Sequence, residues 1–218
     1  LREPGFQGAA PPKRDQTIGH ALREAFSYPS FNLLMAGYFV CGFQVVFIGV
    51  HMPSYLKDNG LSPQVASYAL ALIGLFNVFG TYIAGTLGQR MPRRFILSFI
   101  YLARAVAISV FLLVPLSPLS VYIFSAVMGT LWLSTVPPTN ATIAQIFGVQ
   151  HLSMLGGFVF FSHQLGSFMG VWLGGYLYDA TGSYDIVWYI AIGLGVLAGL
   201  VNLPIKEAPI QRAQPQAA

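Results

Sequence analysis

The chain has 218 residues, of which 55% are hydrophobic, 8% are charged and 23 are glycine, and its formal net charge is +4. Soluble domains carry about 25% charged residues, so this composition excludes a soluble globular protein. Long uncharged runs favour membrane-spanning helices, because a helix satisfies its own backbone hydrogen bonds in lipid. The same runs exclude an outer-membrane barrel, whose strands are about 10 residues of alternating polarity. A nucleic-acid partner is excluded because the basic residues gather at the ends of the apolar runs.

Residues 1–30 differ from the rest of the chain and are predicted to be a cytoplasmic linker with an amphipathic helix. Residues 1–15 are rich in proline, glycine and charged side chains, which is typical of a flexible linker. In residues 17–28 the apolar side chains recur at helical spacing, which predicts a short helix lying on the membrane surface. The alternative is that this stretch is the frayed start of the first span.

Six apolar segments long enough to cross a bilayer follow this region. The predicted spans are about 31–55, 65–87, 95–115, 121–147, 154–178 and 186–203. They are separated by polar or proline-containing turns. The sequence therefore predicts an all-α membrane protein, with one six-helix transmembrane domain over residues 31–205 and a cytoplasmic tail over residues 206–218.

The basic residues are distributed unequally between the two sides of the predicted domain. An even number of spans places both ends of the segment on one side. That side receives nine of the 11 cations, whereas Lys57 lies on the opposite side and Arg104 lies within a span. The positive-inside rule then predicts that both termini of the segment are cytoplasmic, in the plasma (inner) membrane. Cys41, the single cysteine, has no partner, so no disulfide is predicted.

The connection after the second span carries a recognisable loop motif, Gly-Thr-Leu-Gly-Gln-Arg-Met-Pro-Arg-Arg over residues 85–94. It resembles the Gly-x-Leu-x-Asp-Arg-x-Gly-Arg-Arg loop of major facilitator superfamily transporters, in the copy found in the C-terminal half. The glycine, the leucine, the first arginine and the final arginine pair of the motif are in register, at Gly85, Leu87, Arg90, Arg93 and Arg94. The candidate gate residues are Gly85, Arg90, Arg93 and Arg94, together with Gly88 at a variable position of the motif. The family's aspartate is Gln89 here and its second glycine is Pro92, which removes the usual carboxylate of the cytoplasmic gate. An ordinary basic turn is the alternative reading of this loop.

A second resemblance concerns the end of the fifth span. The run Leu173–Asp185 resembles the exit of the penultimate helix in bacterial relatives of the monocarboxylate and oxalate/formate exchangers. This resemblance implies that the chain is the C-terminal half of a twelve-helix transporter, with residues 1–30 joining it to an N-terminal six-helix half. It further implies secondary transport of a small organic anion.

Arg104 is the costliest residue for a membrane-spanning segment. It lies roughly 14 Å from the start of its span at 1.5 Å per residue, and a mid-membrane arginine costs about 2.5 kcal/mol or more on insertion scales. No Asp or Glu lies within any predicted span to neutralise it. A substrate carboxylate could do so with bidentate geometry, which makes Arg104 a candidate substrate-binding residue. The alternative is an arginine bonded to carbonyls of neighbouring helices or reaching the cytoplasmic face.

His163 lies at about the same predicted depth as Arg104. Its imidazole could bind substrate and carry a coupled proton, or it could be a neutral residue that locks two helices together. Gly166, Gly170 and Gly174 recur every four residues beside it, which predicts a smooth stripe for close helix packing.

Three amides and a proline pair complete the candidate site. Asn77, Gln44 and Asn140 are candidates to line the substrate cavity, with bridging between helices as the alternative for the first two. Pro137-Pro138 interrupts the fourth span and predicts a kink, which is either a hinge that moves during transport or a static bend.

The sequence thus predicts a secondary active transporter for a small organic anion such as a monocarboxylate, working by alternating access with proton symport or anion exchange. No enzyme signature, metal-ligand cluster or cofactor motif is present. One alternative is an exporter of hydrophobic compounds of the same superfamily. Another is a non-transporting structural or sensory protein, in which six helices suffice without a second half.

Overall fold

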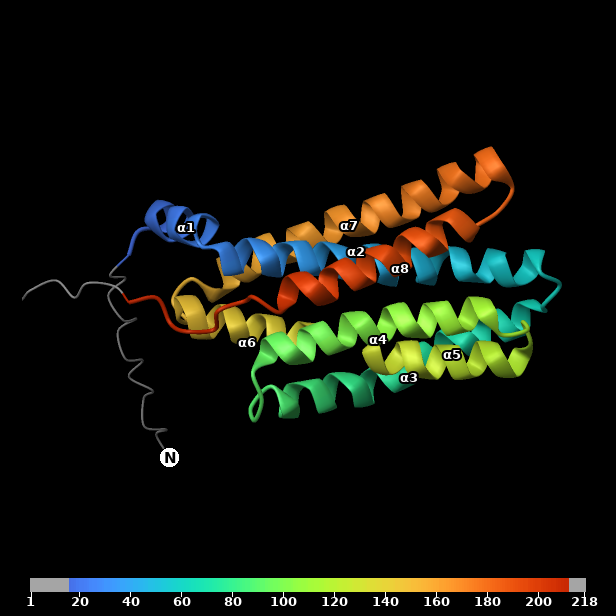
Figure 1. Cartoon of the computed structure of the whole chain (residues 1–218), viewed down its shortest axis with the longest axis horizontal. Coiled ribbons are helices and arrows are strands. Elements are labelled where there is room, and N and C mark those ends of the chain that lie inside the picture. Colours follow the sequence, from blue (N-terminus) through green and yellow to red (C-terminus); the bar gives the residue numbers. More distant parts are fainter. Residues whose placement is uncertain (1–15, 212–218) are drawn as a thin grey trace, which may run out of the picture.

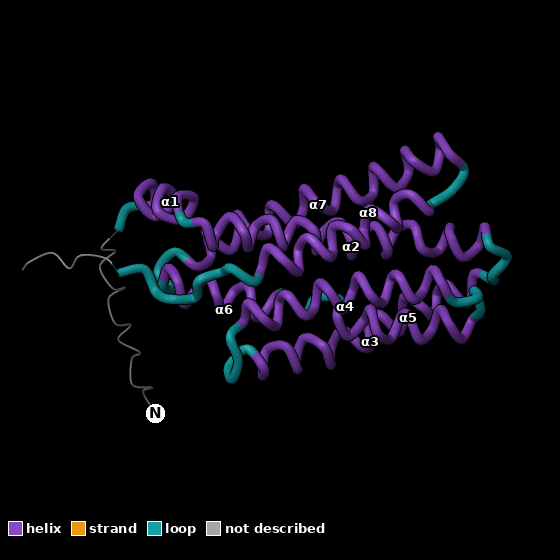
Figure 2. Tube along the Cα trace, viewed as in Figure 1, coloured by secondary structure: helices purple, strands orange, loops and turns teal. Residues whose placement is uncertain are grey.

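A computed structural model describes residues 16–211 of the chain, and the predicted linker over residues 1–15 lies outside the described residues. The described residues form helices and loops without a strand (Figure 2). The helices are α1 (Ile18–Ser27), α2 (Pro29–Asp58), α3 (Pro63–Leu87), α4 (Arg93–Leu113), α5 (Pro118–Leu131), α6 (Val136–Phe147), α7 (Leu152–Thr181) and α8 (Asp185–Asn202). The prediction of an all-α chain is therefore confirmed.

Local sequence signals explain where several helices begin. Pro29, Pro63 and Pro118 each occupy the first helical position, where the missing N–H is harmless and the fixed φ angle suits the helix. Ser117 and Ser120 form a reciprocal capping box at the start of α5. These starts agree with the predicted turns to within a few residues.

The long helices lie along one common direction, with α2, α4 and α7 running one way and α3, α5 and α8 running the other (Figure 1). α2 leads away from the end at which α1 lies, and α8 returns the chain to that end, so the segment after α8 lies near α1. The most extensive helix pairs are α2 with α7, α3 with α5, and α4 with α8. Trp188 lies at the centre of the largest apolar core, against Phe47 and Phe111, and Phe111 stacks on Phe124 at 4.1 Å between ring centroids.

The predicted fourth span consists of two helices rather than one continuous helix. α5 ends at Leu131 and α6 begins at Val136, so the break lies ahead of Pro137-Pro138 rather than at the prolines. The reason is that proline is tolerated in the first turn of a helix, where its N–H would be unpaired in any case. The predicted interruption is present, displaced by a few residues toward the N-terminus.

Five segments of the described chain are long and apolar enough to cross a membrane: residues 29–58, 63–87, 93–113, 118–147 and 185–202. α7 is not among them, although it has 30 residues and runs beside α2. Its glycine, serine, histidine and glutamine residues lower its hydropathy. The fifth predicted span is therefore a helix at the expected place, whose crossing of the membrane stays a prediction.

α1 is a separate helix and not the frayed start of α2. Thr17 caps its first turn, and Tyr28 has an extended backbone that separates it from α2. Ala21 and Ala25 are buried, and the edge of the Phe26 ring meets the rings of Phe31 and Phe158. α1 therefore packs on one end of the bundle, and its predicted contact with a membrane surface stays a prediction.

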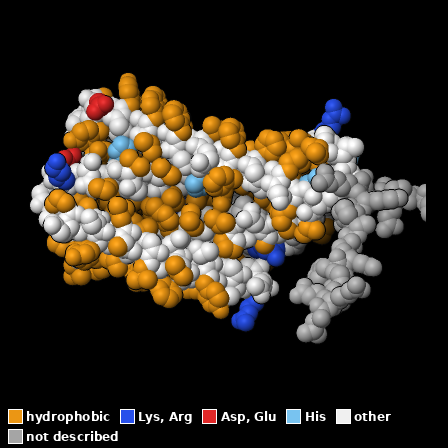
Figure 3. Space-filling view, turned by 180° about the vertical axis from the view of Figure 1, so that it is seen from behind, with side chains coloured by type: hydrophobic (Ala, Val, Ile, Leu, Met, Phe, Trp, Pro, Cys, Tyr) orange, Lys and Arg blue, Asp and Glu red, His pale blue; other side chains and the backbone are white. Residues whose placement is uncertain are grey.

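The surface of the molecule fits a membrane protein. Hydrophobic side chains cover much of the face drawn in Figure 3, whereas basic and acidic side chains lie toward the two ends. Large apolar residues are exposed on most of the helices, including Tyr82 on α3, Leu113 on α4 and Phe168 on α7. In water such a surface would be a liability, whereas lipid or a second protein domain covers it at no cost.

Candidate functional site

The candidate site is built around residues 132–135, the break between α5 and α6. A break in a buried helix leaves carbonyl and amide groups without their helical partners, and each unpaired group costs free energy in an apolar environment. Pro137 and Pro138, in the first turn of α6, have no N–H and so supply no donor to the carbonyls of the break. Polar side chains from α3 and α4 supply the missing partners.

Arg104 of α4 pairs with the carbonyls at the break. The residue is fully buried. Its Nε and Nη2 atoms donate to the Leu131 carbonyl at 3.1 and 2.6 Å, and Nη2 also donates to the Trp132 carbonyl. The guanidinium lies 5.4 Å from the centroid of the Tyr101 ring. The structure thus realises the carbonyl-bonding alternative in this conformation, which leaves substrate binding by Arg104 a prediction.

The charge of Arg104 has no acidic partner in the described helices. The Asp and Glu residues of the described chain lie in α1, at or near helix ends, or after α8. Carbonyl dipoles stabilise the guanidinium, but they carry no net charge. The centre of the bundle therefore holds an uncompensated positive charge at a place where the dielectric constant is low.

Asn77 of α3 pairs with the amide side of the same break. Its Oδ1 atom accepts from the Leu133 N–H at 3.0 Å and from the Thr81 hydroxyl at 3.3 Å. The bridging alternative for Asn77 describes this contact. Two helices thus hold the break, α4 through the carbonyls and α3 through the amide.

Replacing Asn77 with leucine is expected to lower the free energy of unfolding by about 1 to 3 kcal/mol, because the Leu133 N–H would lose its acceptor. Thermal unfolding of the purified protein in detergent measures the loss. Thr81→Val is the matched control, since it removes only the second donor to Asn77 and leaves the bond to Leu133 in place. Equal stability of the two variants would contradict the assigned role of Asn77.

Gln44 of α2 extends the polar contacts to a further helix. It is fully buried, its Nε2 donates to the Ala191 carbonyl of α8 at 2.8 Å, and its Oε1 accepts from Arg104 Nη1 at 3.5 Å. Gln44 therefore contacts the guanidinium through its amide oxygen, while its amide nitrogen donates to α8. As with Asn77, the contact is a bridge between helices.

His163 of α7 lies in a neighbouring group of side chains rather than on Arg104. It is 8% exposed, and its Nδ1 lies 3.2 Å from Gln164 Oε1 and 3.4 Å from Ser167 Oγ. Its ring centroid is 5.3 Å from that of Tyr38 and 5.6 Å from that of Phe160. Its neighbours are thus two hydrogen-bonding side chains and two aromatic rings, and its role in coupling stays a prediction.

One face of α2 connects the surroundings of His163 with those of Arg104. Tyr38, Cys41 and Gln44 recur every three residues, so each is displaced by about 60° from the one before and the three span about 120° of the helix. Tyr38 contacts His163, the Cys41 sulfur lies 3.3 Å from the Thr135 hydroxyl in the break, and Gln44 contacts Arg104. We name Tyr38, Cys41 and Gln44 the α2 polar face. The sequence analysis did not select Tyr38 and Cys41 as site residues, although their spacing of three from Gln44 was a usable signal.

Asn140 of α6 is not brought together with these residues. It is exposed and faces α7 near Gly156, whose added Cβ would lie 3.6 Å from Asn140 Oδ1. Its place on an exposed part of the bundle is compatible with a surface toward another domain, and lining of the cavity stays a prediction.

The glycine stripe of α7 lies directly on α2. A Cβ added to Gly166 would overlap the backbone carbonyl of Phe39, and one added to Gly170 would lie 2.5 Å from the carbonyl of Phe43. At Gly174 the added carbon would lie 2.7 Å from the His51 ring. Because these contacts are with backbone or with the half-buried His51 ring, α2 and α7 approach as closely as they do only while the three positions are glycine.

The loop motif lies at the end of the bundle that also holds α1. Gly85 is in the last turn of α3, Gly88 follows that helix, and Arg90 is exposed. Arg93 and Arg94 begin α4. They contact Gln145 and Glu207, two residues that the sequence analysis did not select.

Comparison with known proteins places these features in a family. The family model described as the Major Facilitator Superfamily matches residues 34–218. The chain is 28% identical over 178 residues to the uncharacterized MFS-type transporter YcxA of Bacillus subtilis, covering 79% of this chain and 43% of that protein.

Mammalian relatives match at similar identity. Monocarboxylate transporter 13 of Rattus norvegicus is 26% identical over 181 residues, covering 80% of this chain and 40% of the relative. Monocarboxylate transporter 12 of Mus musculus is 25% identical over 189 residues, covering 78% and 38%. The chain thus spans about two fifths of the length of the curated relatives that it matches.

Proposed function

The chain belongs to the major facilitator superfamily of secondary transporters, and from this premise we propose that it forms the C-terminal six-helix half of a transporter for small organic anions. The substrate class that we favour is a monocarboxylate. Substrate would bind near the membrane midplane between this half and an N-terminal half, and rocking of the halves would expose it to each side in turn. Both ends of the segment would lie in the cytoplasm, at the plasma membrane.

The observation that carries the anionic substrate class is the uncompensated charge of Arg104. The residue is fully buried, and its described partners are the neutral oxygens of Leu131, Trp132 and Gln44. A mobile anion would gain from the positive potential that this guanidinium creates in a medium of low dielectric constant. The names of the mammalian relatives, which are monocarboxylate transporters, support the same class.

The hydrogen bonds of Arg104 suggest how an anion would couple to movement. A carboxylate carries a negative charge and can accept two parallel bonds from the guanidinium, so it can displace the neutral Leu131 and Trp132 oxygens. The released carbonyls would need new partners, which favours a rearrangement of residues 132–135. We therefore propose that this break, followed by Pro137-Pro138, is a hinge whose position depends on what Arg104 binds.

His163 is the candidate proton carrier of this mechanism. An imidazole changes charge near neutral pH, and a positive imidazolium beside the α2 polar face would raise the attraction for an anion. Proton symport would then follow from joint binding of proton and carboxylate. Without such a role for His163, the same site would exchange one anion for another.

Arg104→Gln is expected to reduce carboxylate uptake by about 10- to 100-fold, because a hydrogen bond to a charged group is worth about 1.5 to 3 kcal/mol. Uptake of radiolabelled acetate, lactate and pyruvate into proteoliposomes that hold the full-length transporter measures this. Arg104→Lys keeps the charge without the planar fork and should retain part of the activity.

Arg23→Gln is the control, because Arg23 is an exposed residue of α1 whose loss removes the same charge outside the bundle. Folding of each variant is checked by its elution on size exclusion and by its unfolding temperature. If a folded Arg104→Gln variant takes up substrate at the wild-type rate, Arg104 does not bind substrate. The argument for an anionic substrate then fails as well.

A further inference from the structure

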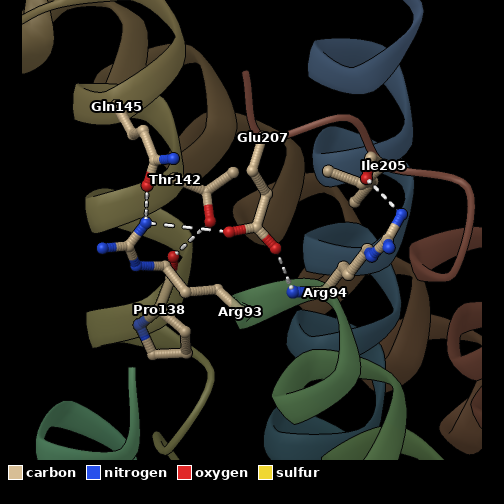
Figure 4. A network of polar contacts seen from close by, with 7 residues as sticks. All are labelled: Arg93, Arg94, Pro138, Thr142, Gln145, Ile205 and Glu207. Carbon is tan, nitrogen blue, oxygen red and sulfur yellow. Dashed lines mark hydrogen bonds and ion pairs between the residues drawn. The ribbon is translucent and has the colours of Figure 1, made fainter. Parts of the chain in front are cut away.

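Glu207 supplies a carboxylate to a loop that has lost its own. The loop over residues 88–94 is basic and carries Gln89 at the position where the related motif has an aspartate. Glu207 follows α8 and is far from this loop in sequence. Its Oε1 accepts from the backbone N–H of Arg94 at 2.8 Å, and its Oε2 lies 3.7 Å from Arg93 Nη1 (Figure 4).

The surroundings of this carboxylate suit a negative charge. Arg93 and Arg94 form the first turn of α4, where unpaired N–H groups and the positive end of the helix dipole favour an anion. The side chains of Arg93 and Glu207 are only 20% and 14% exposed, so the pair is partly shielded from water. The Arg93 guanidinium also donates to Gln145 near the end of α6, which joins α4 to α6 (Figure 4).

Further bonds hold the same segment across the end of the bundle. The Lys206 N–H donates to Ser30 Oγ at the start of α2 at 2.9 Å, and the Ile210 N–H donates to the Ile146 carbonyl at the end of α6 at 3.0 Å. Arg94 Nη1 lies 3.5 Å from the Ile205 carbonyl, and Ile205 is fully buried. We name residues 205–210 the tail strap.

α6 is the element that the tail strap and the helix break share. It has 12 residues, between the break at 132–135, which Arg104 and Asn77 hold, and the end that the tail strap covers. α6 packs against α3, α4 and α7, and the break and the tail strap lie at its two opposite ends. The strap thus restrains the far end of the proposed hinge.

We propose that Glu207 is the latch of a tail strap that closes the α1 end of the bundle by joining the starts of α2 and α4 to the end of α6. The proposal rests on the proposed transport function in one respect, because opening of this end is a step only in a transport cycle. Glu207 acts by positioning the loop and α6, and it does not touch substrate. Release of the latch would separate Glu207 from Arg93 and return both charges to water.

The test measures the release of the strap directly. A thiol is introduced by Ile210→Cys in the full-length transporter whose other cysteines are replaced by serine, and its rate of reaction with a maleimide is recorded in detergent without substrate. Glu207→Gln is expected to raise this rate about tenfold, since the charge-assisted contacts of the latch are lost. Lys206→Gln is the matched control, because it removes one charge from the adjacent exposed residue and is expected to leave the rate unchanged.

An unchanged rate in Glu207→Gln, or an equal rise in Lys206→Gln, would overturn the latch. If Glu207→Gln does not yield folded protein, Arg93→Gln removes the same ion pair from the other side and is expected to give the same rise. The labelling needs no transported substrate. A failure of carboxylate uptake would therefore refute the proposed function without contradicting the role of Glu207 as the latch. The converse also holds, because an unchanged labelling rate refutes the latch whatever the substrate is.

Discussion

Replacing Gly166 with leucine is expected to destabilise the protein by about 3 kcal/mol or more, the upper range for overpacking of a buried contact. The reason is that the new side chain would start inside the space of the Phe39 carbonyl, which is backbone and cannot turn aside. α2 and α7 would have to separate, and the contact between Tyr38 and His163 would be lost. Thermal unfolding in detergent, followed by size exclusion with fluorescence detection, measures the loss.

Gly157→Leu is the matched control for this prediction. Gly157 lies in the same helix, and a Cβ added there meets nothing within 4 Å. Leucine has a better helix propensity than glycine, so this control is expected to be as stable as the unmodified protein or more so. If the two leucine variants unfold at the same temperature, close packing through Gly166 is not a determinant of the fold.

His163→Gln is expected to abolish the dependence of uptake on a proton gradient. A gradient of one pH unit is worth about 1.4 kcal/mol and so sustains about tenfold accumulation of a symported anion. Glutamine preserves hydrogen bonding to Ser167 but does not change charge near neutral pH. Uptake into proteoliposomes with and without an imposed inward proton gradient, at one external pH, measures the coupling.

His51→Gln serves as the control for this variant. His51 is a half-buried imidazole between α2 and α7, with its Nε2 atom 2.9 Å from the Val171 carbonyl. It lies nearer the other end of the bundle from His163, away from the α2 polar face. Loss of coupling in both variants, or in neither, would argue against His163 as the proton carrier. Gradient-independent uptake by the unmodified protein would instead favour anion exchange.

Several features of this molecule follow from the sequence alone because their causes are local. The helices begin and end at prolines and polar turns, and apolar runs of membrane-spanning length lie between them. The four-residue spacing of Gly166, Gly170 and Gly174 is also local, and any helix would turn it into a stripe. The family motif over residues 85–94 is a continuous segment, so its resemblance needed no structure.

The partners of the polar residues depended on the tertiary structure. The sequence shows that a buried Arg104 needs hydrogen-bond acceptors. The structure shows that these acceptors are the carbonyls of residues 27 and 28 positions away, which are unpaired because the helix breaks ahead of the prolines. Glu207 reaches Arg94 across 113 positions. A pattern in sequence shows which group is costly to bury and which backbone bond a proline removes. The packing of the helices decides which donor pairs with which acceptor. A hydrogen bond requires a distance near 3 Å, and these donors and acceptors are far apart along the chain until the helices pack.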